Sequence, residues 1–124
     1  MATLVPSLTL SSSDLNGDIL NLSVADSLAV LGQVSAFQKV ATTTGVVFAA
    51  AANFSKSYVY LKNLSTTAAE IITIEKADGG DEYFSLGAGE FAFFPWASIV
   101  DLALDAAQGS PVLEVRIFQA SAAS

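Results

Sequence analysis

The fold is decided by the stretch Tyr58-Val59-Tyr60-Leu61-Lys62-Asn63, which is followed by Gly87-Ala88-Gly89-Glu90-Phe91-Ala92-Phe93-Phe94-Pro95-Trp96 and by Val112-Leu113-Glu114-Val115-Arg116-Ile117-Phe118. These stretches are rich in β-branched and aromatic residues, and they predict successive strands of a small β-sandwich. The chain contains no His and no Cys, so the residue types that most often perform enzyme chemistry are nearly absent. The sequence therefore indicates shape and assembly more than reaction.

The composition bounds the class of protein. With 124 residues the chain fits one domain that has its own core. Hydrophobic residues make up 52% and charged residues 14%, whereas an average soluble domain is about 25% charged. So little charge predicts that apolar surface is buried against other chains. The longest apolar run, residues 46–52, falls short of the roughly 18 residues of a membrane span, so no membrane protein is expected.

The net charge, the N-terminal residues and the absence of Cys argue against nucleic-acid-binding, secreted and metal-binding proteins. The net charge is −7, from 12 acidic and 5 scattered basic residues, and phosphate neutralisation needs clustered Lys and Arg, so no nucleic-acid partner is expected. The N-terminal residues lack the basic and apolar regions of a signal peptide, so secretion by that route is not expected. Without Cys there are no disulfides or thiolate metal sites, and no cofactor is predicted.

Alternation with a period of two begins near the N-terminus. Leu8 and Leu10 alternate with polar residues within Met1 to Ser13, which predicts an extended arm or an edge strand. Asn16-Gly17 favours a tight turn, and residues 20–24 resume the alternation, which predicts a hairpin. The expected organisation is an N-terminal arm or hairpin over residues 1–30, a β-sandwich over 31–121 and a frayed end over 122–124, within a single domain.

The middle of the chain is ambiguous and the second half is clear. Residues 26–52 could begin as a strand or a short helix, and the β-branched run 40–44 favours strands. Further strands are predicted at residues 57–63, 71–76, 82–86, 90–95, 102–105 and 112–119. Hairpin turns are predicted at residues 78–81, 87–89 and 108–111. The fold class is therefore all-β, an antiparallel β-sandwich or jelly-roll-like fold with an extended N-terminal arm or hairpin.

Acidic clusters are the only candidates for a site with chemistry. The segment Asp14 to Asp18 has oxygen ligands at alternate positions, but it lacks the Gly and the Glu of a calcium loop, so a turn is favoured. A second cluster, Asp78 with Asp81 and Glu82, is explained by a solvated hairpin tip. Carboxylate pairs for glycoside hydrolysis could be formed by Glu90 with Asp101, Asp105 or Glu114, yet nothing selects a pair. No catalytic and no metal residues are predicted.

The aromatic strand at residues 91–96 has two apolar faces. Alternation sends Phe91 and Phe93 to one face and Phe94 and Trp96 to the other. One face can be the core, and the other must be covered by the N-terminal hairpin, another subunit or a ligand. Packing within the chain ranks first, a subunit interface second and a sugar-stacking platform third. The predicted interface residues are Leu8, Leu10, Phe94 and Trp96.

The order of motifs resembles that of a known family. The motifs are Ser-Leu-Thr-Leu from Ser7, Leu-Ser-Val-Ala-Asp-Ser-Leu from Leu22, Tyr-Val-Tyr-Leu-Lys-Asn-Leu from Tyr58 and Gly-x-Gly-Glu-Phe from Gly87 with a Phe-Pro-Trp ending. This order is similar to that of small β-sandwich virion proteins of tailed bacteriophages, notably those of cyanobacteria, from about Ser7 to Phe118. The resemblance implies a virion structural role as a capsid decoration (cement) protein, a head fibre or a tail component, and no catalytic residues.

Three functions compete at this point. The leading one is a capsid cement protein that is made in the host cytoplasm, resides in the virion, self-associates with a trimer favoured, and binds the major capsid protein or another virion protein. Its arm, Met1 to Ser13, would extend over an adjacent subunit. The first rival is a tail or head-fibre component that binds host carbohydrate through Tyr58, Tyr60, Tyr83 or Trp96. The second rival is a polysaccharide hydrolase, against which the sequence argues.

Overall fold

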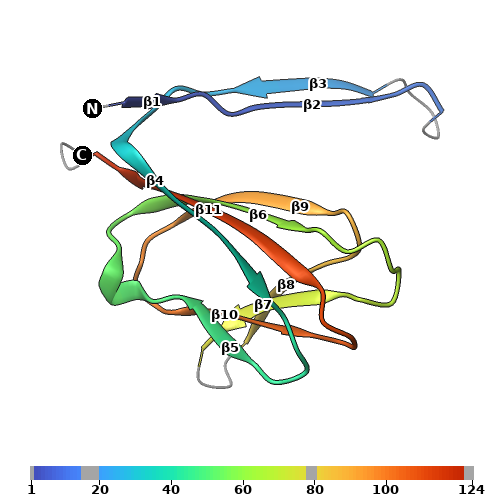
Figure 1. Ribbon diagram of the computed structural model, residues 1–124. Helices are drawn as coiled ribbons and strands as arrows, with labels where there is room; N and C mark the ends of the chain where they lie inside the picture. Colours follow the sequence, from blue (N-terminus) through green and yellow to red (C-terminus); the bar gives the residue numbers. More distant parts are fainter. Residues whose placement is uncertain (1, 15–19, 78–80, 122–124) are drawn as a thin grey trace.

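The computed structural model describes residues 2–14, 20–77 and 81–121, and it confirms an antiparallel all-β sandwich (Figure 1). One sheet has the strand order β1 (Ala2–Leu4), β4 (Leu28–Val40), β11 (Val112–Ala120), β6 (Ser57–Asn63), β9 (Phe91–Trp96). The second sheet has the order β5 (Val46–Ala49), β10 (Leu102–Ala106), β7 (Ile72–Lys76), β8 (Glu82–Leu86). A separate hairpin pairs β2 (Ser7–Ser12) with β3 (Leu20–Ala25).

The core lies between the five-stranded and the four-stranded sheet. Strand β6 alternates strictly between buried and partly buried residues, which places Val59 and Leu61 in the core. Neighbouring strands do the same, because side chains in a strand point alternately to its two faces. The large aliphatic side chains that are fully buried are Val59, Leu61, Ile72, Ile74, Leu102, Leu104, Leu113, Val115 and Ile117. The body of the protein therefore has a complete core of its own.

The strand predictions for the second half are confirmed closely. Strands β6 and β8 have the predicted bounds, and the other four strands differ from the prediction by one or two residues. Strands β4 and β5 confirm the preference for strands over a helix within residues 26–52. The one helical segment in the described ranges is a 3-10 turn at Ala51–Asn53, and no helix there is long and apolar enough to cross a membrane.

Two of the predicted hairpin turns connect strands that belong to different sheets. The strands on either side do not pair, so the prediction of a hairpin is wrong at both turns. Residues 87–89 connect β8 to β9, and residues 108–111 connect β10 to β11, yet each pair of strands is divided between the two sheets. Turn residues mark where the chain reverses, but burial between distant strands decides which strands pair. Residues 78–80 of the third turn lie outside the described residues, while the flanking strands β7 and β8 do pair.

The N-terminal segment folds back within its own chain. Leu8 lies opposite Val24 and Leu10 opposite Leu22, which confirms the predicted hairpin, although its Asn16-Gly17 turn lies outside the described residues. The segment is not one extended arm, because β1 pairs with β4 and β2 pairs with β3. Strand β4 also continues through the expected boundary at residue 30, and residues 122–124 lie outside the described ranges.

One buried polar residue ties the two sheets together. Asn63 ends β6 and is fully buried. Its side-chain amide donates to the carbonyl oxygens of Glu70 at 2.9 Å and of Leu86 at 3.0 Å, and its Oδ1 accepts from the backbone N–H of Ser65 at 2.9 Å. Leu86 belongs to the opposite sheet. The Asn of the Tyr-Val-Tyr-Leu-Lys-Asn stretch is therefore a structural residue, because it satisfies backbone groups that are buried.

Candidate interaction surface

The β2–β3 hairpin is amphipathic. Residues directly opposite each other in an antiparallel pair lie on the same face, so the pairs Leu8 with Val24 and Leu10 with Leu22 form one apolar face. Their exposed fractions are 44%, 51%, 43% and 43% in the same order. The opposite face carries only small and polar residues, namely Ser7, Thr9, Ser11, Asn21, Ser23 and Ala25. The hairpin thus presents an apolar face that its own chain leaves half exposed.

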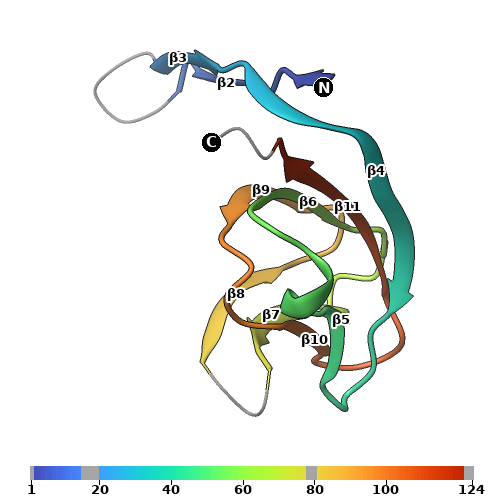
Figure 2. The same cartoon turned by 90° about the vertical axis from the view of Figure 1, so that its left-hand side faces the viewer.

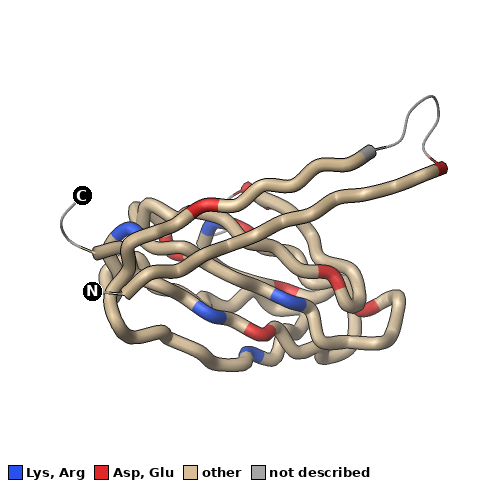
Figure 3. Tube along the Cα trace, turned by 90° about the horizontal axis from the view of Figure 1, so that it is seen from above, with Lys and Arg blue, Asp and Glu red and all other residues tan. Residues whose placement is uncertain are grey.

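The hairpin lies over the outer face of the five-stranded sheet, which is the face directed away from the four-stranded sheet (Figures 1 and 2). Seen from above, the described part of the hairpin extends past the body (Figure 3). Its base is held by the backbone N–H of Asp26, which donates to the carbonyl oxygen of Pro6 at 3.2 Å. An open space of about 630 Å³ separates the two layers. This hairpin groove is lined by Leu4, Pro6, Ser7, Leu8, Val24, Tyr60, Phe91, Ala92, Phe93, Glu114, Arg116 and Phe118.

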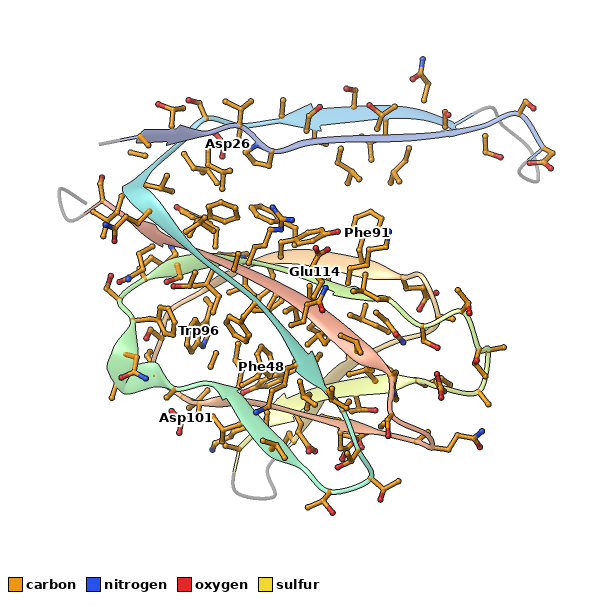
Figure 4. All side chains as sticks on the ribbon, in the orientation of Figure 1. Asp26, Phe48, Phe91, Trp96, Asp101 and Glu114 are labelled. Atoms are coloured by element: carbon orange, nitrogen blue, oxygen red, sulfur yellow. The ribbon has the colours of Figure 1, made fainter. Side chains whose placement is uncertain are left out.

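Aromatic rings form most of the floor of the hairpin groove. Phe91 is directed toward the hairpin (Figure 4), and the rings of Tyr58 and Phe93 are stacked with their centroids 6.5 Å apart. Beside them, a guanidinium nitrogen of Arg116 lies 3.3 Å from Oε2 of Glu114. Large rings with a polar rim are typical of surfaces that bind other molecules. The floor and the hairpin together make a cleft with two apolar walls.

The prediction that Phe94 and Trp96 form an interface is corrected. Trp96 is 7% exposed, its ring lies 5.7 Å from that of Phe54, and its Nε1 donates to the carbonyl oxygen of Val100 at 3.2 Å. Phe94 packs edge-on against Phe84 of the other sheet. Alternation separated the two faces of β9 correctly, but only the position of the second sheet decides which face becomes core.

The residues on the open face of β9 are the ones that sequence reasoning did not select. Phe91 is 59% exposed and Phe93 is 39% exposed. The partners of Leu8 and Leu10 in the hairpin, Leu22 and Val24, were also missed as surface residues. Their signal was present in the sequence, because they continue the same alternation on the far side of the turn.

The four tyrosine and tryptophan residues predicted to stack on sugars do not form one platform. Tyr58 and Tyr60 lie on the outer face of the five-stranded sheet, and Tyr60 lines the hairpin groove. Tyr83 is 48% exposed, but it belongs to β8 at the edge of the other sheet. Trp96 is in the core. The prediction that it stacks on sugars is therefore wrong, as is the prediction that it forms an interface.

The carboxylates that were considered for hydrolysis lie in different parts of the fold, where they accept hydrogen bonds or form an ion pair. Asp101 accepts from the backbone N–H of Ala51 at 2.7 Å, and Glu90 accepts from that of Gly87 at 2.6 Å. Glu114 pairs with Arg116, and Figure 4 shows Glu114 far from Asp101. These contacts hold loops and strands in place.

A carboxylate pair that the sequence did not indicate forms on the four-stranded sheet. Burial is the largest cause that raises the pKa of Glu75 above its ordinary value, followed by the charge of Asp105, a hydrogen bond with Asp105 and the charge of Glu82. In the described ranges no three His, Cys, Asp or Glu residues come together as metal ligands. Of the two acidic clusters singled out in the sequence, residues 15–18 and Asp78 lie outside those ranges. Lys and Arg lie singly along the described chain (Figure 3).

Known proteins offer one structural likeness and no sequence match. No protein-family model and no curated protein sequence matches the chain. A solved structure described as "Bacillus endospore appendages form a novel family of disulfide-linked pili" is similar over 89% of this chain and 97% of that one, with 16% identity and a TM-score of 0.47. The resemblance to phage virion proteins stays a prediction.

Proposed function

We propose that this protein is a structural component of a phage virion, and within that class a capsid decoration (cement) protein that docks through its hairpin groove. The observation that carries the proposal is the amphipathic hairpin, whose four apolar side chains are 43% to 51% exposed above a body that already has a complete core. The order of sequence motifs, which resembles that of small phage virion proteins, supports the choice of class.

The physical reason is that the hairpin needs a partner and the body does not. An isolated two-stranded hairpin is at best marginally stable in water, and an exposed apolar patch rimmed by polar residues marks an interaction site. A segment of a shell protein that enters the groove would cover the hairpin and the aromatic floor together. Many such contacts, repeated over a symmetric shell, would add up to strong stabilisation of the head.

The partner is the major capsid protein or another virion protein, and copies of the chain also associate with one another. The chain is made in the host cytoplasm and resides in the virion. The proposal includes no enzymatic activity, no cofactor, and no nucleic-acid or membrane partner.

The test compares two double variants that add the same charge to opposite faces of the hairpin. Leu10→Asp with Leu22→Asp places two carboxylates on the apolar face, and Thr9→Asp with Ser23→Asp places two on the polar face; each pair lies directly opposite across the strands. Labelled protein is incubated with phage particles purified from a lysate that contains this chain, after the resident copies have been stripped. Bound protein is measured by co-sedimentation.

We expect the apolar-face variant to lose binding and the polar-face variant to keep it. Purified particles should also contain the chain in many copies by quantitative mass spectrometry. Absence of the chain from the particles would refute the virion role. Equal binding by both variants would instead leave the chain in the virion but refute docking through the hairpin.

Carbohydrate binding by a tail or head-fibre protein is a second candidate, because Tyr60, Phe91 and Phe93 line the floor of the hairpin groove, and the ring of Phe93 stacks on that of Tyr58 beside it. Aromatic faces stack on sugar rings. A glycan array probed with the parent protein and with Tyr60→Ala separates this candidate from the first. Glycan binding that disappears in Tyr60→Ala would favour it, and no binding by the parent would remove it.

A further inference from the structure

Strand β4 is an edge strand over most of its length. On one side it pairs with β11 from Val34 to Val40, and on the other side β1 covers only Leu28 to Val30. Figure 2 shows β4 at the margin of the five-stranded sheet, with no strand beyond its C-terminal half. The segment Val34–Val40 therefore has one open side.

The direction of the peptide groups on this open side follows from the hydrogen bonds at both ends of β4. The N–H of Ala41 donates to the carbonyl oxygen of Pro111 at 2.8 Å, and the carbonyl oxygen of Ala29 accepts from the N–H of Ser121 at 3.0 Å, so odd-numbered residues face β11. Peptide groups alternate along a strand. The backbone groups that point to the open side are those of Val34, Ala36, Gln38 and Val40.

This open edge has few of the features that usually protect an edge strand. The register with β11 runs without a bulge from Val40 to Val34, and the segment contains no Pro and one charged residue, Lys39. The opposite edge of the same sheet, β9, is interrupted by Pro95. A regular edge with unpaired N–H and C=O groups is a template for another strand.

We propose that two copies of this chain pair through β4, antiparallel and about a two-fold axis. In the proposed register Val34 lies opposite Val40 of the partner subunit, and Ala36 lies opposite the partner's Gln38. All four outward residues of each copy then form hydrogen-bonded pairs, and the two five-stranded sheets become one continuous sheet.

The side chains fit this register. Val34 and Val40 are 46% and 51% exposed and would pack against each other across the interface. Lys39 lies opposite the partner's Ser35, so the one cation of the segment does not meet its own copy. After Ala41 the chain leaves for the other sheet, where the N–H of Ala106 donates to the carbonyl oxygen of Thr42, which leaves room for β1 of the partner.

The β4 edge and the hairpin groove are different surfaces, so this inference does not depend on the proposed function. It also replaces the trimer that the sequence favoured with a two-fold pair. The occupant is a second copy because the edge pairs with its own copy without a bulge, places no like charges opposite each other, and brings Val34 against the partner's Val40.

Charge variants at the central pair test the register. Ala36→Glu with Gln38→Glu places like charges opposite each other across the interface, and so does Ala36→Lys with Gln38→Lys. Within the subunit, position 36 lies beside Arg116 and position 38 beside Glu114. Each double variant therefore gains one attractive and one repulsive charge pair inside its own sheet, and these offset each other. By light scattering over a concentration series, we expect each variant to self-associate roughly tenfold more weakly than the parent. An equimolar mixture of the two should recover pairing.

Two further variants complete the set. Ala36→Glu with Gln38→Lys places opposite charges both across and within the sheet, and should pair roughly tenfold more tightly than the parent. The control, Ala107→Glu with Gln108→Glu, changes the same residue types in an exposed turn and should pair like the parent. A parent that is monomeric at every concentration, a trimer, or pairing that ignores charges at 36 and 38 would each overturn the proposal.

Amide hydrogen exchange gives an independent readout of the same register. In the pair, the amides of Val34, Ala36, Gln38 and Val40 should become protected as concentration rises, whereas those of the odd residues between them are protected throughout by β11. Leu10→Asp with Leu22→Asp should leave this protection unchanged, which separates β4 pairing from docking through the hairpin. Protection that does not alternate, or that does not depend on concentration, would contradict pairing through β4.

Discussion

The sandwich body and the N-terminal hairpin are built from the same alternating pattern, but they bury their apolar residues to very different degrees. In the body, Leu61, Ile74 and Leu104 are completely buried between two sheets. In the hairpin, Leu10 and Leu22 are each 43% exposed. Because hydrophobic stabilisation follows the apolar area removed from water, the body is stable by itself, whereas the hairpin gains stability only when something covers it.

The largest expected effect breaks the core of the body. Leu104→Ala should lower the free energy of unfolding by about 2 to 5 kcal/mol, because the side chain is fully buried and its removal leaves a cavity. Leu10→Ala in the hairpin should lower it by no more than about 0.5 kcal/mol. Urea unfolding of both variants makes the comparison, and equal losses would contradict the difference between the two regions.

Replacing a buried polar residue of the body should also cost more stability than replacing an exposed polar residue of the hairpin, although the loss is smaller than for Leu104→Ala. Asn63→Ala removes the donor for the carbonyl oxygens of Glu70 and Leu86, and should cost about 2 to 3 kcal/mol because buried carbonyls are left unpaired. Asn21→Ala, at an exposed position of the hairpin, is the matched control and should be nearly neutral. Thermal and urea unfolding measure both variants, and a neutral Asn63→Ala would show that water replaces the lost bonds.

Removal of the whole hairpin should change the stability of the body only slightly. The N–H of Asp26 donates to the carbonyl oxygen of Pro6 at 3.2 Å, so the ends of the hairpin are close together, and an Asn-Gly linker can replace residues 7–25. We expect the free energy of unfolding to change by less than about 1 kcal/mol, since β1 keeps its pairing with β4. Unfolding of the shortened chain would mean that the hairpin belongs to the core.

The smallest effect concerns charge on the exposed face of the four-stranded sheet. The pKa of Glu75 is raised above 4.5, mainly by burial and by Asp105, so the folded chain holds this proton more tightly than the unfolded chain. Glu75 therefore contributes stability while it is protonated, below pH 4.5. This contribution is lost as the pH rises through the pKa of Glu75 in the folded chain. Glu75→Gln should therefore be more stable than the parent at neutral pH and equal to it in acid.

A double-variant cycle checks the cause of this pH dependence. Adding Asp105→Asn to Glu75→Gln should bring less stability than Asp105→Asn brings to the parent, because the repelling partner is already neutral. High salt should shrink the benefit of Glu75→Gln, since the pair lies near the surface. A benefit that is the same at all pH values would point to packing and not to charge.

Much of the fold could be predicted because it depends on neighbouring residues. The bounds of β6 and β8 follow from β-branched and aromatic runs between turn residues, and the pairing of Leu8 with Val24 follows from alternation on both sides of one turn. The surface was predicted only in part. Leu8 and Leu10 lie on it, whereas Phe94 and Trp96, which were also predicted for the interface, lie on the core face of β9.

The sequence by itself determined which segments are strands and which residues share a face, because a period of two is written into consecutive side chains. Only the tertiary structure decided which face of β9 is core, that the turns at residues 87–89 and 108–111 cross between sheets, that Glu75 meets Asp105, and that β4 has an open edge. Each of these depends on which distant strands lie side by side, and that choice is made by burial and pairing over the whole chain.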